Sequence, residues 1–263
     1  MPAPLFIVPP DALKMSSCLL PPEEAHHALQ VLRLKAGDEV QLTDGKGSIA
    51  AAAVYPERKK KMRVEITGMR YVPPYSPRIR VYLGILKARQ RLETALEKLT
   101  ETGVEEIVLM DTAHTERQKF RMNRASAVVT SAVKQSQSAW MPALRYCSFK
   151  EAIQQVENTC SFRDILVAAH EKQDIRLENG RELTGRSFAE IRAHILEENA
   201  TFTTEAAGNR RFHIFIGPEG GFSPEEVSVM LSFSPVMPLW LGAHRLRAET
   251  AAIQTAGLFR FGL

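Results

Sequence analysis

Two short glycine-containing segments near the carboxyl end carry the residues best suited to binding and chemistry. Residues 216–222 have the sequence Ile-Gly-Pro-Glu-Gly-Gly-Phe, and residues 241–251 have the sequence Leu-Gly-Ala-His-Arg-Leu-Arg-Ala-Glu-Thr-Ala. Glycine lets bare backbone N–H and C=O groups approach a ligand and tolerates positive φ angles. In the second segment, Arg245 and Arg247 suit anionic oxygens. Glu249 could orient an arginine or accept a proton, and the alternative is that it stabilises a helix amino terminus.

Both segments follow a strand-like run and precede a helix-like one. Residues 212–216 are a short apolar run typical of a buried parallel strand. A helix start follows, because Ser223 can cap, Pro224 suits the first turn and Glu226 closes a capping box. The second turn follows residues 238–241 and leads into a helix of small residues. Two such turns at one edge of a sheet can share one ligand.

Several common sites are excluded by spacing. Gly217-Pro-Glu-Gly-Gly221 lacks the Gly-x-Gly-x-x-Gly pattern of dinucleotide sites, and the chain has no Gly-Lys-Ser or Gly-Lys-Thr of a P-loop. The three cysteines form no Cys-x-x-Cys pair and the seven histidines are scattered, so we expect no metal. There is no Gly-x-Ser-x-Gly elbow either. We therefore expect a bound cofactor to carry the chemistry.

Composition and charge are those of an ordinary globular protein. No apolar run approaches the roughly 20 residues that span a bilayer, and the amino terminus does not resemble a signal peptide, so we expect a cytoplasmic protein without a membrane partner. The net charge of +4 is small, but residues 76–150 carry 13 Lys and Arg against 7 Asp and Glu. A phosphate-rich ligand is one explanation of this excess, and solvated helix faces are the alternative.

The chain is expected to form two domains separated by a proline-rich linker at residues 71–77. Residues 1–72 predict a small β-rich domain with a helix at 21–33, strands at 39–43, 48–54 and 62–67, and a basic hairpin tip at 58–61. In the helix, Ala25, Leu29 and Leu32 are expected to share the apolar face.

Beyond the linker, strands alternate with longer helices, which indicates an α/β domain with a parallel sheet covered on both faces. The predicted strands are 79–86, 106–110 and 164–169, and the predicted helices are 91–102, 123–137 and 183–199.

Motifs along nearly the whole chain resemble the RsmE family of 16S ribosomal RNA uracil-N3 methyltransferases, within the SPOUT class of knotted methyltransferases. The most specific motifs are residues 216–226 and 241–251. The others are His26-His27-x-x-x-Val31-Leu32-Arg33-Leu34, Gly37-Asp38, Asp44-Gly45, Glu101-x-Gly103-Val104-x-x-Ile107, Glu116-Arg117, Gln135-Ser136 and Pro142. One departure is Lys134-Gln-Ser-Gln-Ser-Ala139, where many members carry Glu-Gln-Ser-x-Arg.

The resemblance implies an amino-terminal PUA-like β-barrel domain for RNA at residues 1–72. It also implies a SPOUT α/β domain at 73–263 that dimerises and has a trefoil knot at about 212–255. The cofactor would be S-adenosylmethionine, held by the knot loops. The implied cofactor-binding residues are Ile216, Gly217, Pro218, Glu219, Gly220, Gly221, Leu241, Gly242, Leu246 and Thr250.

The implied reaction is methylation of N3 of a uridine in 16S ribosomal RNA, with Arg247 and Glu249 as catalytic residues. The RNA of the small ribosomal subunit would be contacted by His26, His27, Arg33, Arg117 and Arg245. Two alternatives remain open. One is a non-catalytic RNA-binding or ribosome-assembly factor, and the other is a SPOUT methyltransferase that acts on transfer RNA.

Overall fold

The structure is a computed structural model that describes residues 3–116, 120–161, 163–176, 182–200, 210–233 and 235–263. Its residues cluster into two compact units. The first comprises Met1–Pro74 and Thr130–Met141, and the second comprises Tyr75–Val129 and Pro142–Leu263. No helix among the described residues is both long and apolar enough to cross a membrane.

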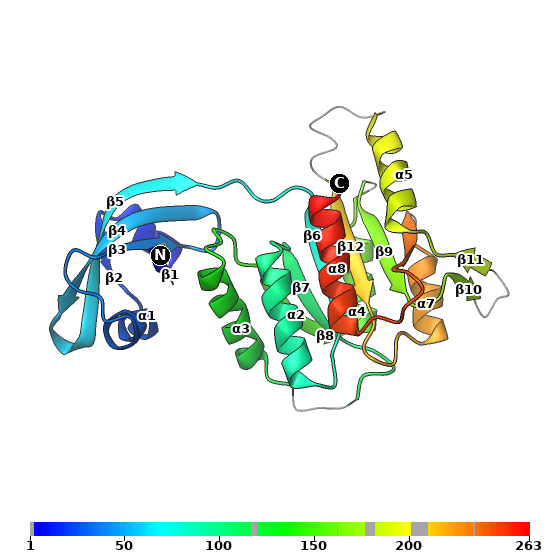
Figure 1. Ribbon diagram of the computed structural model, residues 1–263, viewed down its shortest axis with the longest axis horizontal. Helices are drawn as coiled ribbons and strands as arrows, with labels where there is room; N and C mark the ends of the chain where they lie inside the picture. Colours follow the sequence, from blue (N-terminus) through cyan, green and yellow to red (C-terminus); the bar gives the residue numbers. More distant parts are fainter. Residues whose placement is uncertain (1–2, 117–119, 162, 177–181, 201–209, 234) are drawn as a thin grey trace. The chain divides into compact units, whose positions relative to one another are not determined.

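The first unit is built on a five-stranded sheet with the order β1-β3-β4-β5-β2 (Figure 1). Strands β3, β4 and β5 form an antiparallel meander, β1 runs parallel to β3, and β2 pairs antiparallel with β5. Alternating side chains on these strands bury one apolar face. Barrel closure stays a prediction. The strand bounds are β1 (Leu5–Ile7), β2 (Ser17–Leu19), β3 (Glu39–Thr43), β4 (Ser48–Glu57) and β5 (Lys61–Tyr71).

The expected helix at 21–33 is shorter and changes type part-way. Helix α1 (Pro22–His26) continues into a π-helical turn over His27–Val31, in which the Leu32 N–H bonds the His27 carbonyl. This i→i+5 turn inserts one extra residue and rotates the following side chains. Ala28 is therefore fully buried and Leu32 is exposed, so the prediction that Leu32 shares the apolar face is wrong.

The second unit contains a six-stranded sheet with the order β13-β9-β12-β6-β7-β8, in which every pair is parallel. This confirms the predicted parallel sheet. Beyond β5 the element bounds are β6 (Arg78–Gly84), α2 (Arg89–Glu101), β7 (Glu106–Asp111), α3 (Met122–Gln135), β8 (Ala143–Ser148), α4 (Phe149–Thr159), β9 (Ile165–His170), β10 (Asp174–Arg176), β11 (Glu182–Thr184), α5 (Phe188–Ala200), β12 (Arg211–Ile216), α7 (Pro224–Leu231), β13 (Val236–Trp240) and α8 (Ala248–Phe261). Helix α3 is divided between the units, because its residues from Thr130 onward belong to the first.

Helices cover both faces of this sheet, as predicted. Helices α2 and α8 pack side by side, and α8 lies on β12 and β6, with Phe259 of α8 at 4.8 Å from the ring of Phe212 (Figure 1). Helices α4 and α7 belong to a core cluster that includes Tyr82 and Phe215, whose rings stack at 4.3 Å. Since neighbouring residues of a strand face opposite sides, Phe212 and Phe215 mark the two faces.

The sheet has a topological switch between β12 and β6. From β6 the chain moves outward to β7 and then β8, whereas β9 and β13 lie on the other side of β12. In open α/β sheets, ligands bind outside the carboxyl ends of the strands next to such a switch. The turns that follow β9, β12, β13 and β6 are therefore placed where a site is expected.

Candidate functional site

The first glycine turn is tight and firmly held. The Gly221 N–H donates to the Pro218 carbonyl at 2.9 Å, and a Cβ added at Gly217 would lie 2.9 Å from the Gly221 carbonyl carbon. Only Gly221 of the three glycines in this turn has positive φ, at 71°. The tolerance of glycine for positive φ is therefore used at Gly221 and not at Gly217 or Gly220. Their lack of a side chain serves close approach, since a Cβ at Gly220 would lie 3.0 Å from Cβ of His114.

The helix start after this turn is the predicted one. Ser223 caps α7, Pro224 occupies the first turn, and a reciprocal capping box joins Ser223 to Glu226. The other oxygen of Glu226 accepts the Ala113 N–H at 2.9 Å, and His114 Nδ1 lies 3.2 Å from the Gly221 carbonyl. The loop after β7 thus supports the first turn, a contact that the sequence did not suggest.

The second turn follows β13 and is tied to the first. Gly242 has a φ of 113°, which favours glycine. Arg245 donates to the Glu219 carbonyl at 3.4 Å and pairs with Glu171 at 3.0 Å, so it joins the turns that follow β13, β12 and β9. Arg245 was predicted to contact RNA, and the structure places it within the turn assembly with an exposed side chain.

The two turns line one cavity of about 320 Å³. Every predicted cofactor-binding residue lines it except Thr250, which lies in the first turn of α8. Both turns therefore face a common space, as their positions in the sequence predicted. Ala169, His170 and Glu171 also line the cavity and were missed. The signal was available, because they end a predicted parallel strand and the carboxyl ends of such strands meet at one edge.

Arg91 of α2 is a second residue that sequence reasoning missed. Its guanidinium lies 3.8 Å from the carboxylate of Glu219 in the first turn and 3.7 Å from that of Glu249 at the start of α8. Glu249 is 8% exposed, and its Oε2 has no hydrogen-bond partner among the residues that the structure describes. Arg91 thus links both turns, while one buried carboxylate oxygen beside them remains unsatisfied.

Arg247 is the N-cap residue of α8 and is exposed at the cavity. Within the described chain, no ion pair or side-chain hydrogen bond is found for its guanidinium. Glu249, two residues later, does not line the cavity itself. The predicted catalytic pair therefore consists of a free cation at the cavity and a buried carboxylate behind it.

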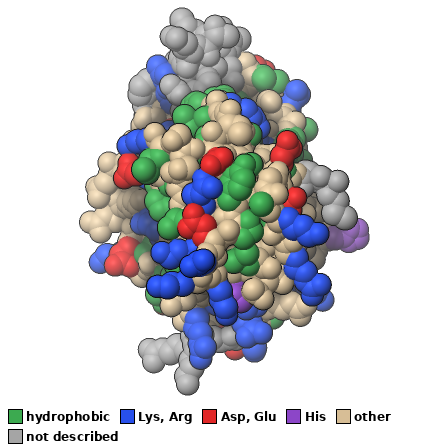
Figure 2. All heavy atoms as spheres, turned by 90° about the vertical axis from the view of Figure 1, so that its left-hand side faces the viewer, with side chains coloured by type: hydrophobic (Ala, Val, Ile, Leu, Met, Phe, Trp, Pro, Cys, Tyr) green, Lys and Arg blue, Asp and Glu red, His purple; other side chains and the backbone are tan. Residues whose placement is uncertain are grey.

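The predicted RNA-binding residues of the first unit differ in accessibility. His26 and Arg33 are exposed, and Arg33 ends the helical segment with a φ of 55°. His27 is half-buried, with its ring edge-on to Phe6 at 6.1 Å, which is a packing role. Arg117 lies outside the described residues. Lys and Arg side chains are spread over the face that Figure 2 presents, with acidic and apolar side chains between them.

A polar cluster lies away from the cavity, near the amino ends of β9 and β12. Ligand-type atoms of Cys160, Asp164 and His213 lie within 4.8 Å of one another. Burial opposes ionisation of Asp164, yet His213, whose Nε2 lies 3.8 Å from the carboxylate, and the N–H groups of Ser161 and Arg211, which donate to it at 3.0 and 3.2 Å, keep the pKa of its carboxyl below the usual value. Burial also lowers the pKa of the His213 imidazole. The cluster therefore places a buried carboxyl group beside a buried imidazole, and the pKa of each is lowered.

Comparisons with known proteins agree with this arrangement. The family described as RNA methyltransferase domain matches residues 74–260, and the RNA methyltransferase PUA domain matches residues 20–67. The chain belongs to the RNA methyltransferase family. Its first unit contains the PUA match, and its second unit contains the cavity and most of the methyltransferase match.

Individual relatives extend over nearly the whole chain. A probable rRNA-methyltransferase from Porphyromonas gingivalis is 32% identical, with 98% of each chain covered and a TM-score of 0.73. Ribosomal RNA small subunit methyltransferase E of Mycobacterium bovis is 26% identical over 242 residues, or 89% of this chain and 82% of that protein. The Neisseria gonorrhoeae protein of the same name, solved bound to S-adenosyl methionine, shares the fold at 22% identity and a TM-score of 0.74, with 97% and 95% coverage.

Proposed function

We propose that this RNA methyltransferase uses S-adenosylmethionine to methylate N3 of a uridine in the RNA of the small ribosomal subunit. The observation that carries the proposal is the single cavity enclosed by the two glycine turns at the carboxyl ends of β9, β12 and β13. Relatives named as small-subunit RNA methyltransferases support the substrate class, and one of them was solved with this cofactor.

The residues around the cavity fit such a cofactor. A Cβ added at Gly221 or Gly242 would meet nothing within 4 Å, so both backbones border open space. Backbone N–H and C=O groups of the turns can therefore bond the polar edges of an adenosine and the amino-acid part of the ligand. The unsatisfied Oε2 of Glu249 offers a buried acceptor close by. When bound, S-adenosylmethionine supplies an electrophilic methyl group.

The remaining chemistry falls to residues of the chain. N3 of uridine carries a proton at neutral pH, so methylation requires removal of that proton or stabilisation of the uracil anion. The guanidinium of Arg247, which has no partner within the described ranges, is suited to stabilise negative charge on a uracil oxygen. Glu249 would orient Arg247 or accept the proton. The target base must leave its stack to reach the cavity, so a single-stranded or loop target is expected.

We assign RNA capture to a PUA-like domain at residues 1–72 and catalysis to a SPOUT domain at 73–263. Exposed His26 and Arg33 support the first assignment, together with the exposed basic tip between β4 and β5. Such cations contribute a salt-dependent, sequence-independent affinity for phosphates. Arg245 would add a contact at the cavity itself, and Arg117 is assigned to RNA binding as well.

We also propose the trefoil knot at about residues 212–255 and a homodimer. The path of the chain supports the knot: β13 lies at one edge of the sheet, yet α8 covers β12 and β6. Residues 241–247 must cross the ends of β9 and β12, and Arg245 is paired there with Glu171 of the segment that follows β9.

Single-turnover methylation of small-subunit ribosomal RNA tests the residue roles. Arg247→Ala and Glu249→Gln should each lower the rate, on the order of 10²-fold for loss of one electrostatic contact to the transition state. Lys150→Gln, an exposed cation on α4, is the matched control and should leave the rate unchanged. Unchanged rates in both site variants would refute the roles.

A methylation map of ribosomal and transfer RNA from cells lacking the protein tests the substrate. The proposal predicts loss of one N3-methyluridine from small-subunit RNA only. Loss confined to transfer RNA would indicate the alternative substrate, and no loss of any methyl group would indicate a non-catalytic RNA-binding protein.

A further inference from the structure

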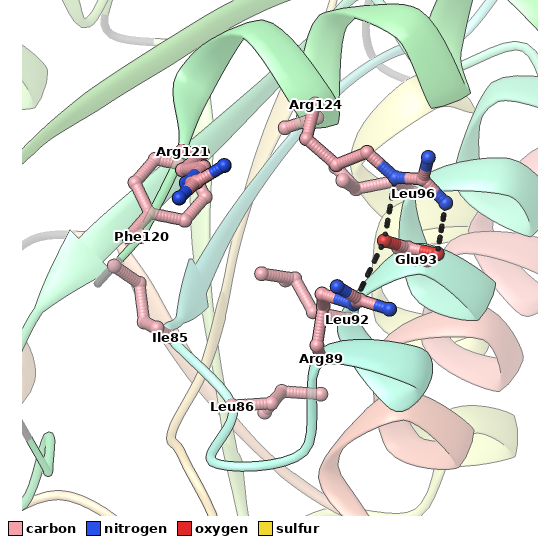
Figure 3. Close-up of a pocket in the computed structure, with 10 residues that line it drawn as sticks. Ile85, Leu86, Arg89, Leu92, Glu93, Leu96, Phe120, Arg121 and Arg124 are labelled. Carbon is pink, nitrogen blue, oxygen red and sulfur yellow. Dashed lines mark hydrogen bonds and ion pairs between the residues drawn. The ribbon is translucent and has the colours of Figure 1, made fainter. Parts of the chain in front are cut away.

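A second cavity, of about 470 Å³, lies between the first turns of α2 and α3 (Figure 3). Its size falls within the range of roughly 300–1,000 Å³ typical of small-molecule sites. The floor is apolar and buried, and it is formed by Ile85, Leu86, Leu92, Leu96 and Ala125. The rim is polar and aromatic, and it is formed by Arg89, Glu93, Phe120, Arg121 and Arg124.

We infer that this cavity binds one unstacked nucleotide of the RNA substrate, with the base against Phe120 and the apolar floor and the phosphate at the arginines. The inference rests on the proposed function, because it assigns a further binding position to the same RNA. It names a position beside the site of methyl transfer and not the target uridine itself.

The charges of the rim favour an anion. Both Nε and Nη2 of Arg124 donate to Glu93, at 2.9 and 3.2 Å, and Nε of Arg89 lies 3.5 Å from the same carboxylate. Glu93 thus pairs with two arginines, and it is the one acidic residue beside three arginines in the lining of this cavity. Arg121 is exposed and forms no ion pair with any residue of the described ranges. Figure 3 shows its guanidinium apart from Glu93. A phosphate can therefore bind Arg121 without breaking an existing pair.

The backbone adds to this positive potential. Helices α2 and α3 both begin at the cavity, and Ala88, the N-cap of α2, supplies no side-chain cap. The first N–H groups of a helix carry a partial positive charge that attracts phosphate. The two helix termini and the three arginines can bind a phosphate. The apolar floor that they surround has no role in binding a phosphate alone. The apolar floor and the ring of Phe120 instead suit a base, which stacks on aromatic side chains without strong sequence preference.

The cavity adjoins the first glycine turn. Gly84, at the end of β6, packs so closely on the turn that an added Cβ would lie 2.5 Å from Cδ of Pro218. The Lys87 N–H donates to the Glu219 carboxylate at 3.1 Å. Residues 84–87 therefore connect the two places: Gly84 and Lys87 contact the first glycine turn, and Ile85 and Leu86 line this cavity. An RNA strand with one nucleotide held here would have its neighbours within reach of the cofactor.

The test uses the full chain and three variants. Arg121→Gln removes the unpaired cation, Phe120→Leu removes the aromatic face, and Lys150→Gln on α4 is the control. A fluorescent single-stranded octauridylate is titrated at several salt concentrations, and S-adenosylmethionine is titrated separately. Arg121→Gln should weaken RNA binding about 3- to 10-fold and lower the log–log salt slope by about 0.7, the contribution of one phosphate contact on a single strand.

Phe120→Leu should weaken RNA binding with an unchanged salt slope, because a stacking contact releases no counterion. Cofactor affinity and thermal midpoint should match those of the control in both variants. RNA affinities equal to the control in folded variants would overturn the inference. It would also be overturned if sedimentation showed altered self-association with unaltered RNA affinity, since the cavity would then be a contact between copies. Failure of the unsubstituted protein to bind S-adenosylmethionine, both alone and with small-subunit ribosomal RNA, would instead refute the proposed function, since the octauridylate affinity is measured without the cofactor.

Discussion

The pair formed by Arg91 and Glu249 gives a quantitative test of how the two turns are held together. Two unit charges about 4 Å apart interact by about 4 kcal/mol at an effective dielectric constant of about 20. The observed separation is 3.7 Å, but the Arg91 side chain is 36% exposed and solvent screens it. Burial of Glu249 has its own desolvation cost. We therefore expect Arg91→Met to lower the free energy of unfolding by about 1–2 kcal/mol, chiefly by leaving a buried charge unpaired.

A double-mutant cycle isolates the interaction. Glu249→Gln removes the charge of the carboxylate and should lower the free energy of unfolding by less than Arg91→Met does. When Arg91→Met is added to Glu249→Gln, it should lower the free energy of unfolding only slightly further. The expected coupling is about 1 kcal/mol. Urea unfolding in a Trp140→Phe background restricts the fluorescence signal to Trp240, which lies in the same unit as the pair. A coupling of zero within error, or an Arg91→Met cost equal to that of Lys150→Met, would refute the reasoning.

Three further outcomes follow from the structure. Gly217→Ala places a Cβ 2.9 Å from the backbone of Gly221, and this overpacking should lower the free energy of unfolding by about 1–3 kcal/mol. Because the first turn is displaced, S-adenosylmethionine binding measured by calorimetry should weaken about tenfold. Gly68→Ala, whose Cβ would meet nothing within 4 Å, should leave S-adenosylmethionine binding unchanged. Burial lowers the pKa of His213 in the folded state, so the unfolded chain takes up this proton first as pH falls through 6.5. The free energy of unfolding should therefore fall from pH 7 to pH 5, and this group can contribute at most about 1.4 kcal/mol per pH unit to the decrease. In the His213→Gln protein the midpoint of urea unfolding should depend less on pH over this range. An equal slope in both proteins would contradict that assignment. Ser223→Ala should cost about 1 kcal/mol through loss of the α7 cap, whereas Ser228→Ala in the same helix should cost little.

Local signals were sufficient for the parts of the fold that depend on neighbouring residues. The cap at Ser223 followed from a few adjacent side chains. The predicted helix at 91–102 ends beside Gly103, whose φ of 78° is the left-handed conformation common after a helix. The alternation of strands and helices beyond residue 77 gave the parallel sheet. Strand β8 was missed because it is an edge strand with half-exposed residues and therefore lacks a continuous apolar run. Helix α4 was also missed, although its capping box at Ser148 and Glu151 was a usable signal.

The features that the sequence did not predict depend on contacts between distant segments or on irregular backbone. Arg91 meets Glu219 and Glu249 only because β6 and β12 are neighbours in the sheet, and no local pattern shows this adjacency. Likewise, position 217 must be glycine because the turn folds back on itself and leaves no room for a side chain. The spacing of the glycines alone could not distinguish this reason from a requirement for positive φ. The position of Leu32 depended on a single π-helical turn, which the helical period does not reveal.

Calorimetric titration of the purified protein with S-adenosylmethionine tests the central claim most directly. The two-turn cavity predicts saturable binding of one cofactor per chain, and that binding should be weakened in the Gly217→Ala protein and retained in the Gly68→Ala protein. Absence of binding, both alone and in the presence of small-subunit ribosomal RNA, would contradict the claim. Equal binding by the two glycine variants would place the cofactor elsewhere than in the cavity formed by these turns.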